Sequence, residues 1–315
     1  MQLEYDIDYR LNSKTGNEPK KGVRPVIKSR GFRTSQASVT QRHWVRSDPF
    51  ATAFFNALSA VFPHGETFMI RSLVPFQNTL PAPLCEEITA FIEQEAGHSR
   101  EHVAMNRGLI EAGYDVEPLD RVIRKFVATF RNSSDLTKVG ATMCIEHITA
   151  IVAAEVLKND HHLADSDSDT RALWLWHAVE EVEHKAVAFD TWMYLTRDWS
   201  GLRRWATRNI MMLLISASFL FNRTRGQVEL LRQDGYGTRS ALMGIFKSGF
   251  GRGGIGRNVT KPWLHFLKPG FHPWDIDDSA LIATGENKLA AIAAEKALAT
   301  KPVERRKLIR LAKAA

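Results

Sequence analysis

The fold of this chain is decided by the stretch Trp174-Leu-Trp-His177-Ala-Val-Glu180-Glu181-Val-Glu183-His184-Lys-Ala, which sets carboxylates and imidazoles inside an apolar, Ala-rich run. A helix turns about 100° per residue, so the side chains of His177, Glu180, Glu181 and His184 share one face, while Glu183 points elsewhere. Apolar neighbours indicate that this face looks into a core, where unpaired charges are costly unless a cation neutralises them. A solvated surface helix is the alternative for this segment taken alone.

A second segment repeats the arrangement. In the stretch that begins at Phe91, the side chains of Glu95, His98 and His102 share one face of a helix. Two helices with Glu-x-x-His, packed face to face, can hold two metal ions with one His for each. This is the pattern of the four-helix di-metal carboxylate bundle, which also needs one Glu from each of two other helices.

Two single glutamates complete the predicted set. Glu66 stands beside Phe68 and Met69 near the start of a helix, where an acid that complements the helix dipole is the alternative explanation. Glu146 lies in the middle of an apolar helix that runs from Asp135 to Leu157. The predicted metal ligands are therefore Glu66, Glu95, His98, Glu146, Glu181 and His184.

This ligand set also indicates the metal and the catalytic groups. Hard carboxylate oxygens with imidazole favour two iron ions, with manganese or zinc as alternatives. His102 and His177 lie one turn from the ligand pairs, where they can orient ligands, relay protons or extend the coordination. Glu180, four residues before His184, is the alternative to Glu181 as a ligand. We take His102, His177 and Glu180 as the candidate catalytic residues.

These motifs follow one another in the order found in ferritin-like di-iron proteins. More closely, they resemble the bacterial family called predicted metal-dependent hydrolases, over about residues 48 to 278. The resemblance implies a metal site more directly than it implies hydrolysis. The segments that carry it are Phe62-Pro-x-Gly-Glu66, Phe91-Ile-x-Gln-Glu95-x-x-His98-x-x-x-His102-x-x-x-Asn106, Glu146-His147-x-Thr149-Ala150, Trp176-His177-x-x-Glu180-Glu181-x-Glu183-His184-Lys185 and Phe271-His-Pro-Trp274.

The predicted fold class is all-α: a ferritin-like four-helix bundle with additional helices and a basic N-terminal arm. Helical periodicity covers nearly every apolar stretch after residue 48, and strand-like alternation is rare. We expect a flexible basic arm at 1–47, a di-metal bundle domain at 48–278 and a solvated helix or tail at 279–315. The two cysteines lie in apolar helical contexts, so neither a disulfide framework nor a Cys-based zinc site is expected.

The net charge and the N-terminal sequence limit which partners and which cellular location are expected. The net charge is +7, and the arm is rich in Lys and Arg, which suits an anionic membrane surface or a solubilising tail. Nucleic acid is not expected as a partner, because the chain lacks helix-turn-helix or zinc-finger spacing and an aromatic ladder. The N-terminus lacks the apolar core of a signal peptide, so we expect a cytoplasmic protein, with a peripheral place on the inner membrane face as an option.

Residues 210–221 are almost continuously apolar and are flanked by Arg and Trp. At 1.5 Å per residue this run covers roughly 18 Å, which is too short to cross a bilayer core of about 30 Å. A buried helix, a helix lying in a membrane interface and an oligomer contact such as a homodimer all stay open.

From the ligand set we expect an oxygen-activating di-iron oxidoreductase that acts on a lipophilic small molecule. The reasons are an apolar enclosure and the lack of a recognisable acyl-transfer nucleophile. The first alternative is a metal-dependent hydrolase that uses a metal-activated water. The further alternative is a non-catalytic membrane-surface or iron-storage protein.

Overall fold

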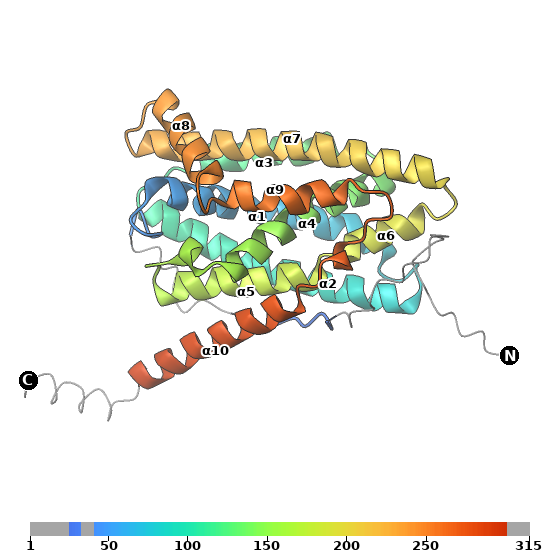
Figure 1. The fold of residues 1–315 in the computed structure, drawn as a ribbon, viewed down its shortest axis with the longest axis horizontal. Coiled ribbons are helices and arrows are strands. Elements are labelled where there is room, and N and C mark those ends of the chain that lie inside the picture. Colours follow the sequence, from blue (N-terminus) through green and yellow to red (C-terminus); the bar gives the residue numbers. More distant parts are fainter. Residues whose placement is uncertain (1–24, 33–40, 301–315) are drawn as a thin grey trace, which may run out of the picture.

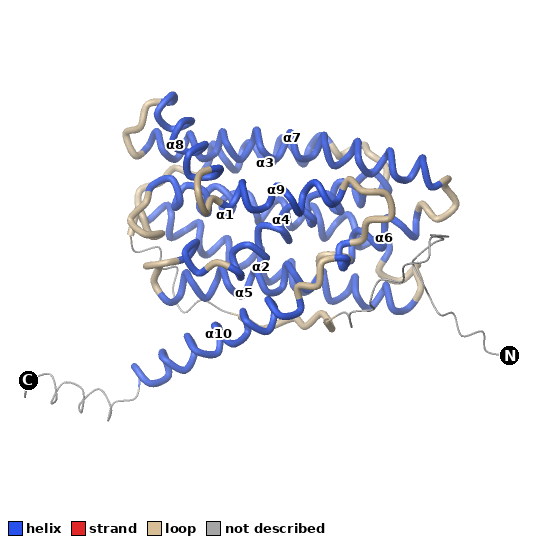
Figure 2. The backbone as a smooth tube through the Cα atoms, in the orientation of Figure 1, coloured by secondary structure: helices blue, strands red, loops and turns tan. Residues whose placement is uncertain are grey.

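The computed structural model describes residues 25–32 and 41–300, and within these residues helices are the only regular elements (Figures 1 and 2). The predicted all-α class is confirmed, whereas the ferritin-like arrangement stays a prediction. The helices are α1 (Pro49–Leu73), α2 (Ala82–Glu111), α3 (Glu117–Thr129), α4 (Asp135–Lys158), α5 (Ser168–His184), α6 (Val187–Leu195), α7 (Gly201–Gln233), α8 (Thr238–Phe250), α9 (Ile255–Phe266) and α10 (Ser279–Thr300), with short 3-10 turns at Val74–Phe76, Asp160–Leu163 and Pro273–Asp275.

Four helices surround the centre of the molecule. Helix α1 packs on α2 and α4, and α5 packs on α4 and α2. Three of the four begin at a polar cap, as their sequences indicate: the carboxylate of Asp48 accepts from two amides of α1, Asp167 does the same for α5, and Ser134 caps α4. These caps fix where each helix starts and so fix the height at which its inward glutamates lie.

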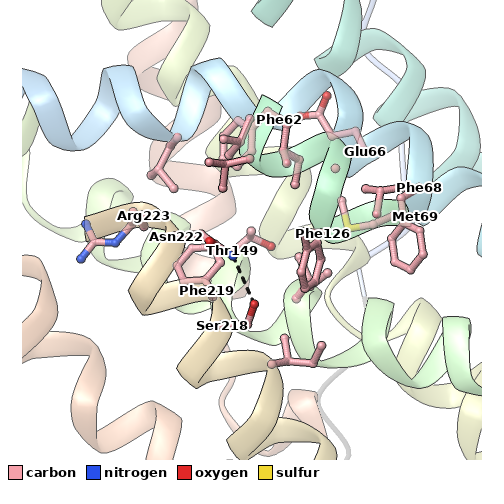
Figure 3. Close-up of a pocket in the computed structure, with 18 of the residues that line it drawn as sticks. Phe62, Glu66, Phe68, Met69, Phe126, Thr149, Ser218, Phe219, Asn222 and Arg223 are labelled. Carbon is pink, nitrogen blue, oxygen red and sulfur yellow. Dashed lines mark hydrogen bonds between the residues drawn. The ribbon is translucent and has the colours of Figure 1, made fainter. Parts of the chain in front are cut away.

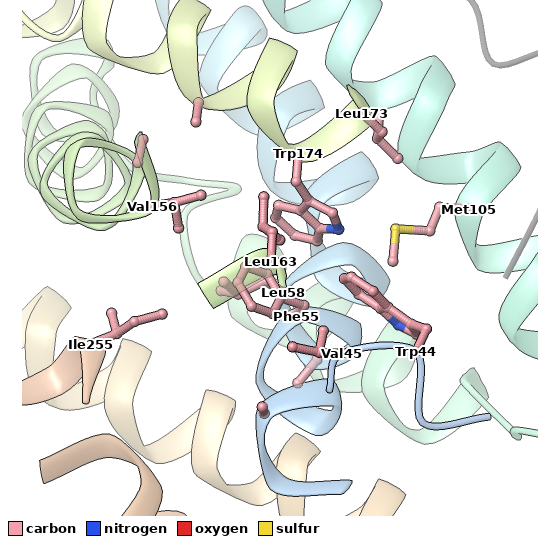
Figure 4. Packing of buried hydrophobic residues seen from close by; sticks show 14 of the residues in the cluster. Trp44, Val45, Phe55, Leu58, Met105, Val156, Leu163, Leu173, Trp174 and Ile255 are labelled. Atoms are coloured by element: carbon pink, nitrogen blue, oxygen red, sulfur yellow. The ribbon is translucent and has the colours of Figure 1, made fainter. Parts of the chain in front are cut away.

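Buried apolar side chains form two clusters. The first contains Phe55 and Trp174 (Figure 4), and the second contains Phe91 and Trp192. On α1 the first cluster reaches Ala60 and the second begins at Phe68; on α2 the second cluster ends at Phe91 and the first begins at Met105. Glu66, Glu95, His98 and His102 lie in these two gaps. The polar centre is therefore enclosed between two apolar layers.

Two described parts of the expected N-terminal arm, 1–47, pack on the bundle. The ring of Phe32 stacks on Trp176, with centroids 4.9 Å apart, and Trp44 and Val45 are fully buried. The expectation of a flexible arm is wrong at these positions, because their apolar side chains find partners that local periodicity cannot reveal. The remaining positions of the arm lie outside the described residues.

Helix α7 runs along the upper edge of the molecule in Figure 1 and packs on α1, α3, α4 and α8. The apolar run 210–221 lies within it and is two-sided: Met212 and Ile215 are buried, while Leu214 and Phe221 are 67% and 68% exposed. The run is therefore covered by the protein on one side and exposed on the other. Among the described residues, only α4 is long and apolar enough to cross a membrane, and 72% of its apolar window is buried, as in a core helix.

Helix α10 departs from the expectation of a solvated tail in its first two turns. Its Ile282 is buried, and Gly285 packs against Val179 of α5 and Leu157 of α4. The rest of 279–315 beyond residue 300 lies outside the described residues.

Candidate metal centre

The six predicted ligands meet in one place, two from α2, two from α5 and one each from α1 and α4. The Nε2 atom of His184 lies 3.2 Å from Glu95 Oε1, 3.1 Å from Glu146 Oε2 and 3.6 Å from Glu181 Oε1. The Nδ1 atom of His98 lies 3.4 Å from the same Glu95 oxygen and 3.6 Å from Glu181 Oε1. All six side chains are buried.

Among the described residues, four groups of three have the spacing that a metal ion needs; two of them contain His177, and the other two consist only of predicted ligands. Glu66, Glu95 and His98 offer ligand atoms within 4.8 Å of one another, and so do Glu95, Glu181 and His184. The two groups share Glu95. A carboxylate shared by two neighbouring cation positions can bridge two metal ions, as in the carboxylate bundles.

Several buried nitrogen and oxygen atoms of this cluster lack a hydrogen-bond partner among the described residues, as expected of a site that binds a cation. Although the atoms approach one another closely, the facing nitrogens, His98 Nδ1 and His184 Nε2, have no aligned partner among the described residues. A buried polar atom without a partner costs about 1–3 kcal/mol, so a group of them needs an explanation. A metal ion supplies one, because it would bind lone pairs that no hydrogen bond uses. The unpartnered oxygens are both of Glu66, Glu95 and Glu146, together with Glu181 Oε2.

The pKa values show the excess of negative charge. Burial, followed by repulsion from Glu95, raises the pKa of Glu66, and burial raises the pKa of Glu146 to about 8. Burial alone would lower the pKa of His98, but its carboxylate neighbours outweigh this and raise it to about 10. A divalent cation would relieve the same crowding and would hold the carboxylates ionised.

Gln94 fixes the tautomer of His184. Its Nε2 donates to the carbonyl of Lys28 at 3.1 Å and to Glu183 Oε2 at 3.0 Å, so its Oε1 must face His184. That oxygen lies 2.8 Å from His184 Nδ1 and accepts its proton. In neutral His184 the other nitrogen would therefore present a lone pair to the centre, as metal-ligating histidines do when their second nitrogen is hydrogen-bonded. Burial lowers the pKa of His184, but Glu146 and Glu181 outweigh this and raise it, so a cation would have to displace the proton on Nε2.

Glu180 fixes the orientation of His98 in the same way. Its Oε2 lies 3.1 Å from His98 Nε2, and its Oε1 accepts from the backbone amide of Arg30 at 2.8 Å. Its carboxylate therefore lies behind His98, on the side away from Nδ1. The guanidinium of Arg30 meanwhile makes two hydrogen bonds to Glu183, at 2.6 and 2.7 Å. The structure thus groups Glu181 with the converging atoms and leaves Glu180 and Glu183 outside them.

A chain of hydrogen bonds leads away from the centre through both remaining histidines. His177 Nε2 lies 3.2 Å from Glu181 Oε1, and His177 Nδ1 lies 2.8 Å from His102 Nε2. His102 Nδ1 lies 3.0 Å from the hydroxyl of Ser59, which donates to Asn106 Oδ1 at 2.8 Å. Burial lowers the pKa of both histidines, which favours their neutral forms.

The direction of this chain follows from its far end. Asn106 Nδ2 donates to the backbone carbonyl of Ser59, so Asn106 Oδ1 must accept from the Ser59 hydroxyl. That hydroxyl accepts from His102 Nδ1, and neutral His102 then accepts from His177 Nδ1 through Nε2. In this direction Nε2 of neutral His177 carries a lone pair 3.2 Å from Glu181 Oε1, and it would donate to that oxygen only after it takes up a proton.

An apolar pocket reaches the centre from the side of α3 and α7 (Figure 3). Glu66 and Glu181 belong to its lining, and its few other polar groups include Thr149 and Asn222. Asn222 Nδ2 donates to Ser218 Oγ at 3.2 Å, the dashed line in Figure 3. The apolar wall is built mainly by Phe62, Phe68, Met69, Phe126, Ile215 and Phe219.

All nine predicted site residues thus lie in one buried cluster, and their roles as ligands or catalytic groups remain predictions. Sequence reasoning missed Gln94, Arg30 and Ser59. The only local signal was the position of Gln94 immediately before a predicted ligand. Their partners on other helices are invisible to helical spacing.

Comparison with known protein families matches residues 28–277, most of the chain, to a family described as "predicted metal-dependent hydrolase". The same comparisons found no similar curated protein and no similar solved structure. The match begins at Lys28, whose carbonyl contacts Gln94, and so includes the segment that packs behind the candidate ligands. The chain belongs to the family of predicted metal-dependent hydrolases.

Proposed function

We propose that this protein is a hydrolase with a two-metal centre, acting on a lipophilic substrate. The observation that carries the proposal is the pair of ligand groups that share Glu95 and have unpartnered lone pairs. The family supports hydrolysis and gives no support to the oxygen-activating reaction that the ligand set first indicated. It also favours an enzyme over a storage protein.

The first metal position would be held by Glu66, Glu95 and His98, and the second by Glu95, Glu181 and His184, with Glu146 beside His184. Bound there, two divalent ions would polarise a scissile carbonyl or phosphoryl group and make a water molecule acidic enough to attack it. The metal identity is open between iron, manganese and zinc, because carboxylate and imidazole ligands suit all three.

His177 is the proton acceptor in this proposal. Its Nε2 carries a lone pair beside Glu181 Oε1, and its Nδ1 proton is held by His102. When His177 takes a proton, His102 and Ser59 stabilise the resulting cation through hydrogen bonds that already exist. Removing such a group costs about 10²–10⁴-fold in rate.

The pocket suggests the class of substrate. Its wall is made mostly of aromatic and aliphatic side chains, and it ends at Glu66 and Glu181. A substrate with an apolar body would therefore place its scissile bond at the centre and exclude water around the rest of its length. Carboxylic esters of fatty acids and lipid phosphoesters both have this form.

The test uses full-length protein freed of metal and reloaded separately with ferrous iron, manganese or zinc. Nitrophenyl esters with short and long acyl chains, and a nitrophenyl phosphodiester, are offered with and without oxygen. We expect metal-dependent hydrolysis that is indifferent to oxygen and faster for the longer chains. In His177→Gln, kcat should fall by about 10²-fold or more while two metals remain bound. Turnover that requires oxygen would contradict the proposal and favour oxidation.

A further inference from the structure

The outer face of α7 is an apolar stripe. Leu213, Leu214, Leu220 and Phe221 are between 50% and 68% exposed, and Ile210 is 57% exposed. Their spacing places them within roughly 120° of arc on one side of the helix. We call these five residues the α7 stripe. Large apolar side chains scattered singly over a surface are normal, but a row of them along one helix marks an interaction surface.

Helix α8, which packs on α7, has a similar outer face. Leu242, Met243, Phe246 and Phe250 are all at least 45% exposed. At 100° per residue they lie within roughly 100° of arc, on one side of α8. Both exposed faces therefore belong to neighbouring helices at the upper edge of the molecule in Figure 1.

The segment that contains these faces is strongly basic. Residues 201–270, which contain α7, α8 and α9, have twelve Lys and Arg and two acidic residues. This excess of ten positive charges is larger than the net charge of +7 for the whole chain, so the rest of the chain is slightly acidic. Among the exposed cations, Arg225 follows the α7 stripe and Lys247 stands within the exposed face of α8.

The inner face of the same helix lines the apolar pocket. Ile215, Phe219 and Asn222 of α7 belong to the lining that also contains Glu66 and Glu181 (Figure 3). A surface contacted by the outside of α7 would therefore lie one helix diameter from the pocket. An apolar outer face flanked by basic residues is typical of a helix that lies in the plane of a membrane interface.

We propose that the α7 stripe and the exposed face of α8 rest on the surface of an anionic lipid bilayer. The apolar side chains enter the interface, and the surrounding Lys and Arg contact lipid phosphates. The charge of this region decides between a membrane and a second copy of the chain, because two such basic faces would repel each other. The proposal concerns binding and stands whether or not the centre is a hydrolase.

The test is sedimentation of the full-length protein with vesicles at low salt. We expect binding to vesicles of phosphatidylcholine mixed with phosphatidylglycerol, weak binding to phosphatidylcholine alone, and release at high salt. The double variant Leu214→Gln, Phe221→Gln should partition about tenfold less well. The double variant Arg225→Glu, Lys247→Glu should lose the preference for anionic lipid. Matched controls are Ile110→Gln and Arg107→Glu on α2, both exposed and away from α7, which should bind as the unchanged protein does.

A second measurement does not depend on losing binding. A polarity-sensitive dye on Leu214→Cys should shift to the blue when anionic vesicles are added, and the same dye on Ile110→Cys should not; the native cysteines are common to both. Full recovery of the unchanged protein in the supernatant with anionic vesicles would overturn the proposal. So would a dimer in light scattering that the Leu214→Gln, Phe221→Gln variant converts to a monomer, without any vesicle binding by the unchanged protein.

Discussion

At the scale of single residues, the two candidate metal-binding histidines are held by different kinds of partner. A carboxylate, Glu180, accepts from His98, whereas an amide, Gln94, accepts from His184. A carboxylate makes the opposite ring nitrogen more basic than an amide does, so the two metal positions should differ in affinity. The position that contains His98 should fill first as metal is added.

Removing the amide should weaken the second position. In Gln94→Ala, His184 loses the acceptor of its Nδ1 proton and can turn to the other tautomer, so metal affinity should fall by about 10–100-fold. Metal titration followed by calorimetry measures this. Glu93→Ala, next to it on the exposed side of α2, is the control and should leave both affinities unchanged. Equal affinities in Gln94→Ala and Glu93→Ala would show that Gln94 does not orient a ligand.

Glu181→Ala should lower the metal content from two ions toward one or none. Glu181 Oε1 faces both candidate histidines, at 3.6 Å from each, while the carboxylate of Glu180 lies behind His98. Elemental analysis of the purified protein provides the readout. Glu183→Ala would be a poor control, because it frees two of its partners, the buried Gln94 and the partly buried Arg30. If Glu181→Ala retains two tightly bound metals, the assignment of the second Glu-x-x-His is wrong.

Sequence reasoning found residues whose partners are close in sequence and missed residues whose partners are distant in sequence. Glu95 and His98 lie within one turn of a helix, so their shared face could be predicted from spacing alone. Gln94 acts on a residue 90 positions away, and Arg30 acts on one 153 positions away. Such partners depend on how helices pack, which helical periodicity does not specify.

At the scale of elements, the helices predicted near the centre are present, except that no helix starts just before Glu66: α1 runs from Pro49 to Leu73 through Pro63, and Glu66 lies in its second half. The remaining difficulty is to predict which side of each helix is covered. The run 210–221 left core, membrane and oligomer open, because periodicity finds an apolar helix but does not tell which side is covered. The two sides of α7 are now distinct, with Ile215 buried and Leu214 exposed. Helix α10 raises the same question, since a chain rich in Ala and Lys can be solvated or packed.

Gly285 tests how α10 is attached. A Cβ atom at this position would lie 2.4 Å from Val179 Cγ2 and 2.9 Å from Leu157 Cδ2, so a side chain there must push α10 away. Gly285→Val should weaken the packing of α10 by about 1–3 kcal/mol. Trypsin should then cut at Lys288 faster than in the unchanged protein. Ala283→Val, exposed on the same helix, is the control and should be cut at the normal rate. Equal rates in both would mean that α10 is not held through this contact.

At the scale of the whole molecule, one buried histidine outside the centre should make stability depend on pH. Burial lowers the pKa of His162 below its usual value of 6.5, although its hydrogen bond to Glu155 acts in the opposite direction. Below this value the unfolded chain takes up a proton that the folded chain resists, so stability falls as pH falls. His162→Gln should therefore lose less stability between about pH 7 and about pH 5.5 than the unchanged protein. Urea unfolding at both pH values gives the comparison, and parallel losses would exclude the role of His162.

The buried carboxylates of the centre should destabilise the metal-free protein, and bound metal should stabilise it. Four buried carboxylates crowd together, and repulsion from Glu95 helps to raise the pKa of Glu66. Metal that binds only the folded protein stabilises it by about 2.7 kcal/mol at a hundredfold excess over Kd, which is roughly 4 °C in Tm for a chain of this size. A chelator should remove that gain. In Glu95→Gln the shared ligand is lost and one negative charge disappears, so Tm in chelator should rise while the gain from metal disappears. The opposite pair of results, a lower Tm in chelator and an unchanged gain from metal, would mean that the glutamates and histidines form a structural network and that the metal binds elsewhere.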